Sequence, residues 1–230
     1  MFDRYSIASS PSALAAAFSI DPHGFEKPRY NAAPAQLLPV ITTGSAGLSH
    51  FYWGTAPEWA KNKSIGEKII NLRVEQIAER PAVKKQIRKY RCIVPADGFY
   101  GWKKVGKKTS IPHRFEPIPK ALFPMAGVWE EYDDENGNMI HTFMIITVPA
   151  NESVMGITER MPAILTAEES KRWLAELTSD EQLMECLHPF NGKLESYPVS
   201  PRINDITVDN ATLIQPTPPQ DQFGNLTLFN

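Results

Sequence analysis

The sequence is poor in cysteine and histidine, and it has no excess of basic residues. Its 230 residues include two cysteines, Cys92 and Cys186, and five histidines that lack the spacing of a metal site. Cys92 begins an apolar run and Cys186 lies in an amphipathic stretch, so we expect two buried thiols, with no disulfide, metal or cofactor. The net charge of −2 argues against indiscriminate nucleic-acid binding, but it is compatible with a local basic groove.

Long apolar runs and a signal-peptide pattern are also missing. No stretch has the length and apolarity of a membrane span, and the first residues, MFDRYSIASS, do not resemble a secretory signal. We therefore expect a cytoplasmic protein without a membrane partner, in a reducing compartment that suits two free thiols. The sequence gives no indication of the oligomeric state.

What is present is the pattern of an α+β domain. The apolar fraction of 42% is ordinary for a globular protein, and a chain of this length can bury a core without disulfides. Stretches rich in aromatic and β-branched residues do not alternate regularly with helices, as they would around a parallel sheet. The sequence predicts one compact domain over residues 1–216, with twisted antiparallel sheets and peripheral helices, and an extended tail over residues 217–230.

Local signals place several elements. Ser10 followed by proline marks a helix start, and Thr166 with Glu169 forms a capping box ahead of another helix. Pro81 divides a basic helical segment into two helices. We also expect residues 91–105 to form strand structure, and we expect hairpins that join residues 37–43 to 48–54 and residues 121–133 to 139–148.

Seven short motifs follow one another along the chain. They are RYNAAPAQ (29–36), YWGTAPEWAK (52–61), IINLRVE (69–75), CIVPADGFYGWKK (92–104), MAGVWE (125–130), ITERMPAIL (157–165) and YPVSPRIN (197–204). In this order they resemble the motifs of the SRAP family, the SOS-response-associated peptidases, which are also described as abasic-site-processing proteins. The resemblance extends from Met1 to about Pro216, and seven motifs in the right order are not expected by chance.

The resemblance implies a compact, β-rich fold with a barrel-like core and a basic groove for single-stranded DNA. In family members the initiator methionine is removed, and the amine of the new N-terminal cysteine forms a Schiff base with the aldehyde of an abasic site. The thiolate then closes a thiazolidine ring, because an amine and a thiol on adjacent carbons form a five-membered ring. An asparagine, a glutamate and a histidine in three of the motifs assist, and the glutamate and the histidine move protons.

Three of these chemical positions are replaced in this chain. Phe2 stands at the cysteine position, Gly101 at the glutamate position and Thr158 at the histidine position. None of these side chains is a base near neutral pH, and the bulk of Phe2 disfavours removal of the methionine. Asp3, at a glycine position, would repel a phosphate. We therefore expect a pseudoenzyme with a degenerate site and assign no catalytic residue.

The resemblance also assigns residues to DNA binding. The candidates are Arg4, Asn71, Arg73, Trp102, Arg160, Trp59, Ser200 and Arg202. Each has a structural alternative. Asn71 and Arg73 contact DNA or open a helix, with Glu75 in its first turn. The two tryptophans stack on bases or pack in the core.

The arginines and the last motif carry similar alternatives. Arg4 and Arg160 bind phosphates, or they form surface ion pairs with Asp3 and Glu159. Ser200 and Arg202 line the groove or anchor the end of the domain. Two basic runs would bind phosphates if they faced one groove, and would otherwise be solvated surfaces. They comprise Lys103, Lys104, Lys107 and Lys108, and, on a helix, Lys84, Lys85, Arg88, Lys89 and Arg91.

The sequence thus predicts a SRAP-family protein that retains a groove for single-stranded or abasic DNA and lacks the crosslinking cysteine. Two alternatives stay open. The first is residual enzyme activity, either a lyase that forms its Schiff base through Met1 or Lys103, or the peptidase activity for which the family is named. The second is a protein-interaction module that does not bind DNA.

Overall fold

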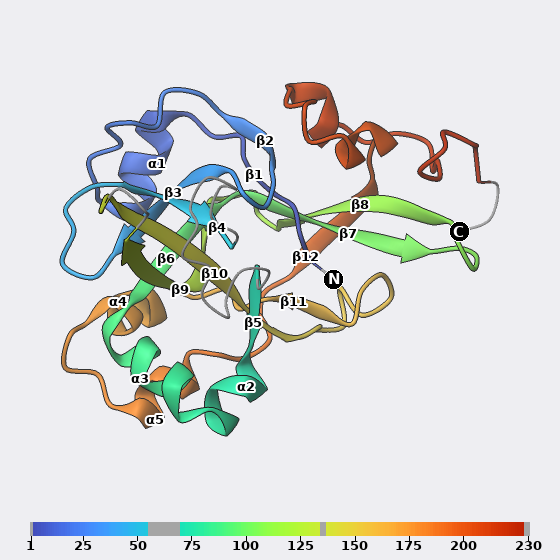
Figure 1. Cartoon of the computed structure of the whole chain (residues 1–230). Coiled ribbons are helices and arrows are strands. Elements are labelled where there is room, and N and C mark those ends of the chain that lie inside the picture. Colours follow the sequence, from blue (N-terminus) through green and yellow to red (C-terminus); the bar gives the residue numbers. More distant parts are fainter. Residues whose placement is uncertain (1, 55–69, 134–136, 228–230) are drawn as a thin grey trace.

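The computed structural model describes residues 2–54, 70–133 and 137–227, which form two sheets with helices around them (Figure 1). The strands are β1 (Tyr5–Ile7), β2 (Arg29–Ala32), β3 (Leu37–Thr42), β4 (Ser49–Trp53), β5 (Asn71–Arg73), β6 (Arg91–Ala96), β7 (Gly98–Lys104), β8 (Ser110–Pro117), β9 (Phe123–Asp133), β10 (Met139–Pro149), β11 (Arg160–Pro162) and β12 (Leu194–Pro198). The helices are α1 (Pro11–Phe18), α2 (Val74–Glu79), α3 (Pro81–Lys89), α4 (Ala167–Leu174) and α5 (Asp180–Glu185), followed by the 3-10 helices η1 (Pro201–Asn204) and η2 (Ala211–Ile214).

The larger sheet closes on itself. Its strands pair in the order β10, β4, β3, β6 and β9, and β9 pairs back with β10, while β5 and β11 also pair with β10. This ring confirms the barrel-like α+β fold. Two pairings, β10 with β4 and β10 with β5, are parallel, which departs from the antiparallel pattern expected from the sequence. Parallel pairing is possible there because the long stretch of chain before β10 provides the crossover connection.

The smaller sheet is antiparallel and has the order β12-β8-β7-β1-β2. The expected strand structure of residues 91–105 is divided at Asp97, so that β6 belongs to the barrel and β7 to the second sheet. The Asp97 carboxylate accepts hydrogen bonds from the backbone of Ala8 (2.6 Å) and Ser9 (2.9 Å). Asp97 therefore fastens the end of β1 at the junction of the two sheets.

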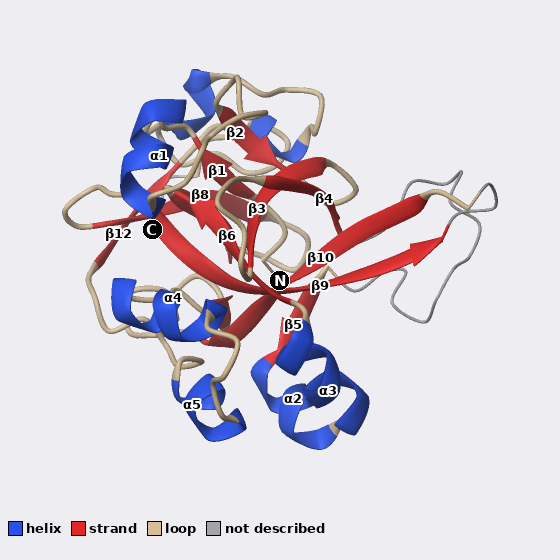
Figure 2. Cartoon of the chain, turned by 90° about the vertical axis from the view of Figure 1, so that its left-hand side faces the viewer, coloured by secondary structure: helices blue, strands red, loops and turns tan. Residues whose placement is uncertain are grey.

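The helices lie at the periphery of the sheets (Figure 2). Three local predictions are confirmed: Ser10 caps α1, Thr166 and Glu169 form the capping box of α4, and α2 and α3 meet at Pro81. The hairpin of β3 and β4 and the pairing of β9 with β10 are also confirmed. No helix in the described ranges is long and apolar enough to span a membrane.

The C-terminal tail contains more structure than the extended form expected from its sequence. Gln220 and Leu226 form an isolated β-bridge around a tight turn, and Gly224 in this turn has a φ of +84°. The turn lies against the tip of the β7–β8 hairpin, where the backbone amide of Ser110 donates to the Gln222 side chain (2.9 Å). The domain boundary at residue 216 stays a prediction.

A histidine fastens the loop after α5. Nε2 of His188 lies 2.7 Å from Oε1 of Glu169, and Nδ1 lies 2.9 Å from the carbonyl oxygen of Pro189. Both partners are acceptors, so the doubly protonated ring satisfies both contacts. The hydrogen bonds to Pro189 and Glu169 raise the pKa of His188.

This raised pKa predicts that stability depends on pH. The stabilisation from His188 is complete below the unfolded-state pKa of about 6.5 and is lost as the pH rises through the higher folded-state pKa. We expect the melting temperature to decline as the pH rises from about 6.5 through the folded-state pKa of His188. In His188→Gln the contribution of this histidine to the decline should be absent. The measurement is thermal unfolding at a series of pH values, and identical pH profiles for the two proteins would contradict the prediction.

Candidate nucleic-acid interface

Asn71 lies on strand β5, where the barrel meets the beginning of the chain. It pairs with Ile145 of β10, and its side-chain amide donates a hydrogen bond to the carbonyl oxygen of Phe2. The interpretation of Asn71 as a helix cap is therefore wrong, because the N-cap residue of α2 is Arg73. Asn71 positions the main chain at residue 2.

The side chain of Phe2 points into the core. It is 2% exposed, and its ring packs against Trp53 at 5.7 Å and against Phe99 at 5.8 Å between centroids. The position assigned to the nucleophile is thus filled by an inert aromatic ring. The two cysteines of the chain offer no replacement, because both are buried elsewhere and burial raises the pKa of both thiols.

Gly101 and Thr158 come together in space although 57 residues separate them in the sequence. A β-carbon added at Gly101 would lie 3.3 Å from Cγ2 of Thr158 and 3.0 Å from Cε2 of Phe115. Phe115 stacks on Phe99, which in turn contacts Phe2. Packing therefore links the three replaced positions through Phe115 and Phe99, and a β-carbon at residue 101 would crowd Phe115 and Thr158.

Arg160 joins β11 to β10 and α2. Its guanidinium donates to both carboxylate oxygens of Glu75 (3.0 and 2.9 Å) and to the carbonyl oxygen of Thr147 (2.6 Å). The hydrogen bonds from Arg160 lower the pKa of Glu75. The expected ion pair with Glu159 is wrong, because β10 brings Arg160 close to Glu75 instead. Most of the N–H groups of Arg160 are therefore used inside the protein.

Arg4 and Arg73 differ in whether their guanidinium groups are paired inside the protein. Arg4 pairs with Asp3 at 3.3 Å, as the structural alternative predicted, and its side chain is 12% exposed. Burial raises the pKa of Asp3, while Arg4 acts in the opposite direction. Arg73 is exposed and has no side-chain ion pair with any described residue. Of these two arginines, Arg73 is the one available to a phosphate.

Three polar atoms beside Phe2 are buried without a hydrogen-bond partner in the described part of the chain. They are Nε of Arg4, Oδ1 of Asp3 and Oδ1 of Asn71. An unsatisfied buried polar group is costly, and such groups gather at binding sites because a ligand or water completes them. These atoms provide one donor and two acceptors around the start of β1.

Trp102 anchors the last family motif to β7. It is half-buried, and its indole N–H donates to Oδ1 of Asn204 (2.9 Å). It packs on a small apolar cluster that includes Tyr100 and Ile203. The structure therefore contains the packing contacts of the structural alternative, while the DNA contact of Trp102 stays a prediction. Trp59 lies outside the described residues.

Ser200 has a structural role in the last family motif, whereas the DNA contact of Arg202 stays a prediction. Ser200 is the N-cap of η1 and accepts a hydrogen bond from the backbone amide of Arg202 (3.4 Å). The Arg202 side chain is exposed and has no ion pair in the described residues. Buried Asn31 fixes this segment from beneath, since its amide donates to the carbonyl oxygens of Ile203 (3.2 Å) and Val208 (2.9 Å).

The two basic runs do not converge on one groove. In Figure 1 the tip of the β7–β8 hairpin and helix α3 lie on different sides of the molecule. Lys84 and Arg88 on α3 both pair with Asp180. Arg91, counted with this run in the sequence, is 2% exposed and donates to backbone carbonyl groups, among them that of Ile87 (2.8 Å). The hairpin lysines are the run that stays free to bind phosphates.

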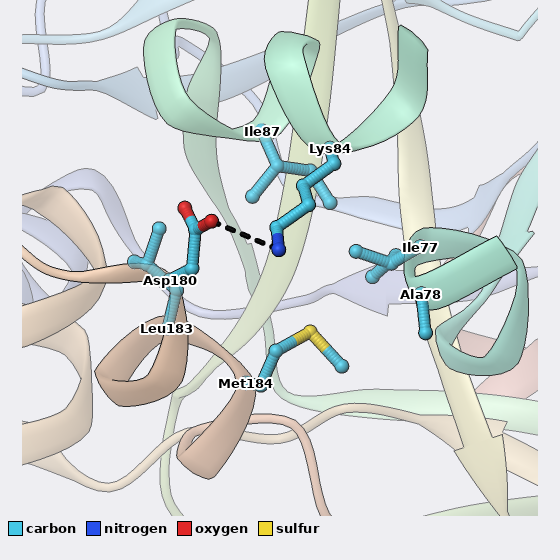
Figure 3. A pocket seen from close by; sticks show the side chains of 7 residues that line it. All are labelled: Ile77, Ala78, Lys84, Ile87, Asp180, Leu183 and Met184. Atoms are coloured by element: carbon cyan, nitrogen blue, oxygen red, sulfur yellow. Dashed lines mark ion pairs between the residues drawn. The ribbon is translucent and has the colours of Figure 1, made fainter. Parts of the chain in front are cut away.

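A pocket lies between α2, α3 and α5 (Figure 3). Its volume is about 380 Å³, part of which is open to solvent. The ion pair between Lys84 and Asp180 (3.0 Å) lies at its border. The remaining lining is apolar and comprises Ile77, Ala78, Ile87, Leu183 and Met184. None of the candidate site residues lines this pocket. The described residues also contain no cluster of three or more potential metal ligands.

A buried charge network beneath the site is not evident from the motifs. Arg114 of β8 contacts Asp97 and Glu116, and it donates to Ser6 of β1 (3.3 Å). A sequence signal does exist for it, because Arg114 and Glu116 alternate with apolar residues in SIPHRFEP and therefore share one face of the strand. The network stabilises the strand that carries Phe2 into the site.

Comparisons with known proteins agree with this geometry. The family model described as SOS response associated peptidase (SRAP) matches residues 1–206. Abasic site processing protein YoqW of Bacillus subtilis is 38% identical over 222 residues, which cover 94% of this chain and 99% of that protein. Abasic site processing protein YedK of Escherichia coli is 29% identical over 195 residues, which cover 82% and 84% of the two chains.

Solved structures show the same fold. The crystal structure of a protein from Bacteroides thetaiotaomicron has a TM-score of 0.80 at 28% identity, covering 93% of this chain and 99% of that chain. A protein from Bordetella bronchiseptica has a TM-score of 0.71 at 21% identity, covering 86% and 99% of the two chains, which supports the fold alone. On the family match and the identity to YoqW, this chain belongs to the SRAP family.

Proposed function

We propose that this protein binds single-stranded or abasic DNA and does not form a covalent crosslink with it. The observation that carries the proposal is the packing that links Phe2, Gly101 and Thr158 through Phe99 and Phe115, because none of these three side chains supplies a thiol for the crosslink or a base for proton transfer. Relatives that are named abasic site processing proteins support DNA as the ligand. A cytoplasmic location is part of the proposal, and the two free thiols support it.

The binding part of the proposal rests on exposed cations that form no ion pair with a described carboxylate, although Arg73 and Arg202 interact electrostatically with Glu75 and Asp205. Arg73 follows Asn71 on β5, Arg202 lies on η1, and lysines follow Trp102 along the β7–β8 hairpin. Contacts between such cations and phosphates release counterions, so affinity falls steeply with added salt. The test is the affinity for labelled single-stranded DNA at a series of salt concentrations, and absent or salt-independent binding would contradict the proposal.

Two arginine substitutions separate direct contact from positioning. Arg73→Ala is expected to lower the slope of log affinity against log salt by about 0.7, because one phosphate contact of a single strand is lost. It should leave the melting temperature unchanged, since the side chain is exposed.

Arg160→Ala is the matched variant, since it also removes one positive charge. It is expected to keep the salt slope and to lower the free energy of unfolding by about 1–2 kcal/mol, because the contact with Thr147 is part-buried and the pair with exposed Glu75 is weakened by solvent. If the two variants behave alike in both measurements, the distinction between a free and a bound arginine is wrong.

A further inference from the structure

The C-terminal turn is closed by hydrogen bonds to the side chain of Asp221 and between backbone groups. Asp221 is 7% exposed, and its carboxylate accepts hydrogen bonds from the backbone amides of Phe223 and Asn225, both at 2.9 Å. The backbone closes the same turn, since Gly224 donates to the carbonyl oxygen of Asp221 (2.9 Å) and Thr227 donates to that of Pro219 (2.9 Å). The side chain of Asp221 thus acts as the centre of a compact loop, as aspartate often does in turns.

This turn is attached to the tip of the β7–β8 hairpin. Oε1 of Gln222 accepts from the backbone amide of Ser110, and its Nε2 donates to the carbonyl oxygen of Lys108. Figure 1 shows the tail, in red, reaching the tip of this hairpin, in green. The turn lies beyond residues 1–206, which the family model matches.

An aromatic side chain projects from the turn. Phe223 is 72% exposed, although its backbone amide is fixed by Asp221. Single exposed apolar residues are common on proteins, but most of them are not held beside a basic surface. Here Gln222, the preceding residue, binds the carbonyl group of Lys108. The turn that carries Phe223 is thereby attached to the segment that carries the hairpin lysines.

The charges on this surface fit a polyanion. Lys104, Lys107 and Lys108 are exposed and have no ion pair with a described residue. The nearby carboxylate of Asp221 points inward, toward the backbone of its own turn. Proteins that bind single strands combine cations for the phosphates with aromatic rings on which unpaired bases stack.

We infer that Phe223 is a stacking platform for an unpaired base of single-stranded nucleic acid, with Lys107 and Lys108 binding the adjacent phosphates. The inference rests on the proposed DNA-binding function and extends its surface from the site around Phe2 to the C-terminal turn. A stacked base contributes to affinity and leaves the number of phosphate contacts unchanged.

The experiment measures the affinity of the full chain for a short labelled oligothymidine at fixed salt. Phe223→Ala is expected to weaken binding between about fivefold and about 150-fold, the loss that corresponds to one stacked base. The salt slope should stay the same, because no charge is removed. Phe223→Trp should retain the affinity, whereas Phe223→Leu, which stays apolar without an aromatic face, should lose it.

Leu226→Ala is the matched control, since Leu226 is 65% exposed on the same turn and should not affect binding. An affinity equal to that of the wild type in Phe223→Ala or in Phe223→Leu would overturn the inference. In that case, weaker DNA binding by Arg73→Ala would still support the proposed function. A wild-type protein that does not bind the oligonucleotide would overturn both. The melting temperatures of all variants should match that of the wild type, because these side chains are exposed.

Discussion

Abasic single-stranded DNA incubated with this protein is expected to give no heat-stable conjugate on a denaturing gel. Phe2 has neither a thiol nor a hydroxyl group, and its ring is packed between Trp53 and Phe99. Without a thiol the second bond of the thiazolidine cannot form, so any imine with an amine would be reversible. A family member with cysteine at this position serves as the positive control.

Restoring the missing groups should restore the reaction in steps. We expect slow conjugate formation from Phe2→Cys with Asp3→Gly, provided that mass spectrometry shows cysteine as the first residue. Adding Gly101→Glu and Thr158→His should accelerate it by about 10²–10⁴-fold, the usual contribution of proton transfer.

The restored variants have a cost in stability. Replacing buried Phe2 by cysteine leaves a cavity, which lowers the free energy of unfolding by about 2–4 kcal/mol. A β-carbon at residue 101 would also lie closer than ordinary van der Waals contact, 3.0 Å from Phe115 and 3.3 Å from Thr158, so a glutamate there requires its neighbours to shift slightly. The reaction should therefore be assayed at a temperature at which each variant is folded.

Two outcomes would contradict these expectations. A heat-stable conjugate that the unmodified protein forms without a reducing agent would show that the site is not degenerate. A folded quadruple variant that begins with cysteine and still does not react would show that the groove, and not only the chemistry, has changed. The second outcome would also weaken the proposal that the protein binds DNA.

Among the single substitutions considered, replacement of the buried Arg114 is expected to cause the largest loss of stability. Its side chain is 4% exposed and lies 3.2 Å from Oδ1 of Asp97, and it also contacts Glu116. Without the guanidinium, Asp97 keeps its hydrogen bonds from Ala8 and Ser9, and among the described residues Glu116 keeps only the exposed Lys120 as a cationic partner. Because a buried cation is removed from two carboxylates, Arg114→Met should lower the free energy of unfolding by about 3–5 kcal/mol. For a chain of this size that corresponds to a fall in melting temperature of about 6–20 °C.

The matched control is Arg88→Met. Arg88 also makes two hydrogen bonds to one carboxylate, that of Asp180, but its side chain is 62% exposed. Surface ion pairs contribute at most about 1 kcal/mol. Equal losses at the two positions would show that the Arg114 network is not buried as described. Arg114→Lys should not restore stability, because one ammonium group cannot reach the several partners of the planar guanidinium.

The glycine at residue 98 belongs to the same network. A β-carbon there would lie 2.6 Å from the guanidinium of Arg114, so only glycine allows the side chain to pass. This contact explains the glycine at position 98 of the PADGFYGW segment, which does not have the positive φ that requires glycine in many turns. The requirement is steric and arises between β7 and β8, two neighbouring strands of the smaller sheet.

The elements of the fold that depend on neighbours in sequence were predictable. Ser10 with Pro11 and Thr166 with Glu169 begin helices as expected, because the hydrogen bonds of a helix cap join residues two or three positions apart. The family and its barrel-like fold were also predictable, since seven ordered motifs carry that information. The replaced positions Phe2, Gly101 and Thr158 were evident for the same reason.

Only the tertiary structure decided how these residues are used. Asn71 is a strand residue that binds Phe2, and Arg160 pairs with Glu75, 85 residues away, instead of with its neighbour Glu159. Both outcomes follow from β10, which pairs with β5 on the one hand and β11 on the other. Local sequence patterns do not predict such contacts between distant residues, because the contacts depend on which strands become neighbours in the sheet. The same holds for the two basic runs, whose separation is set by the positions of α3 and the β7–β8 hairpin in the fold.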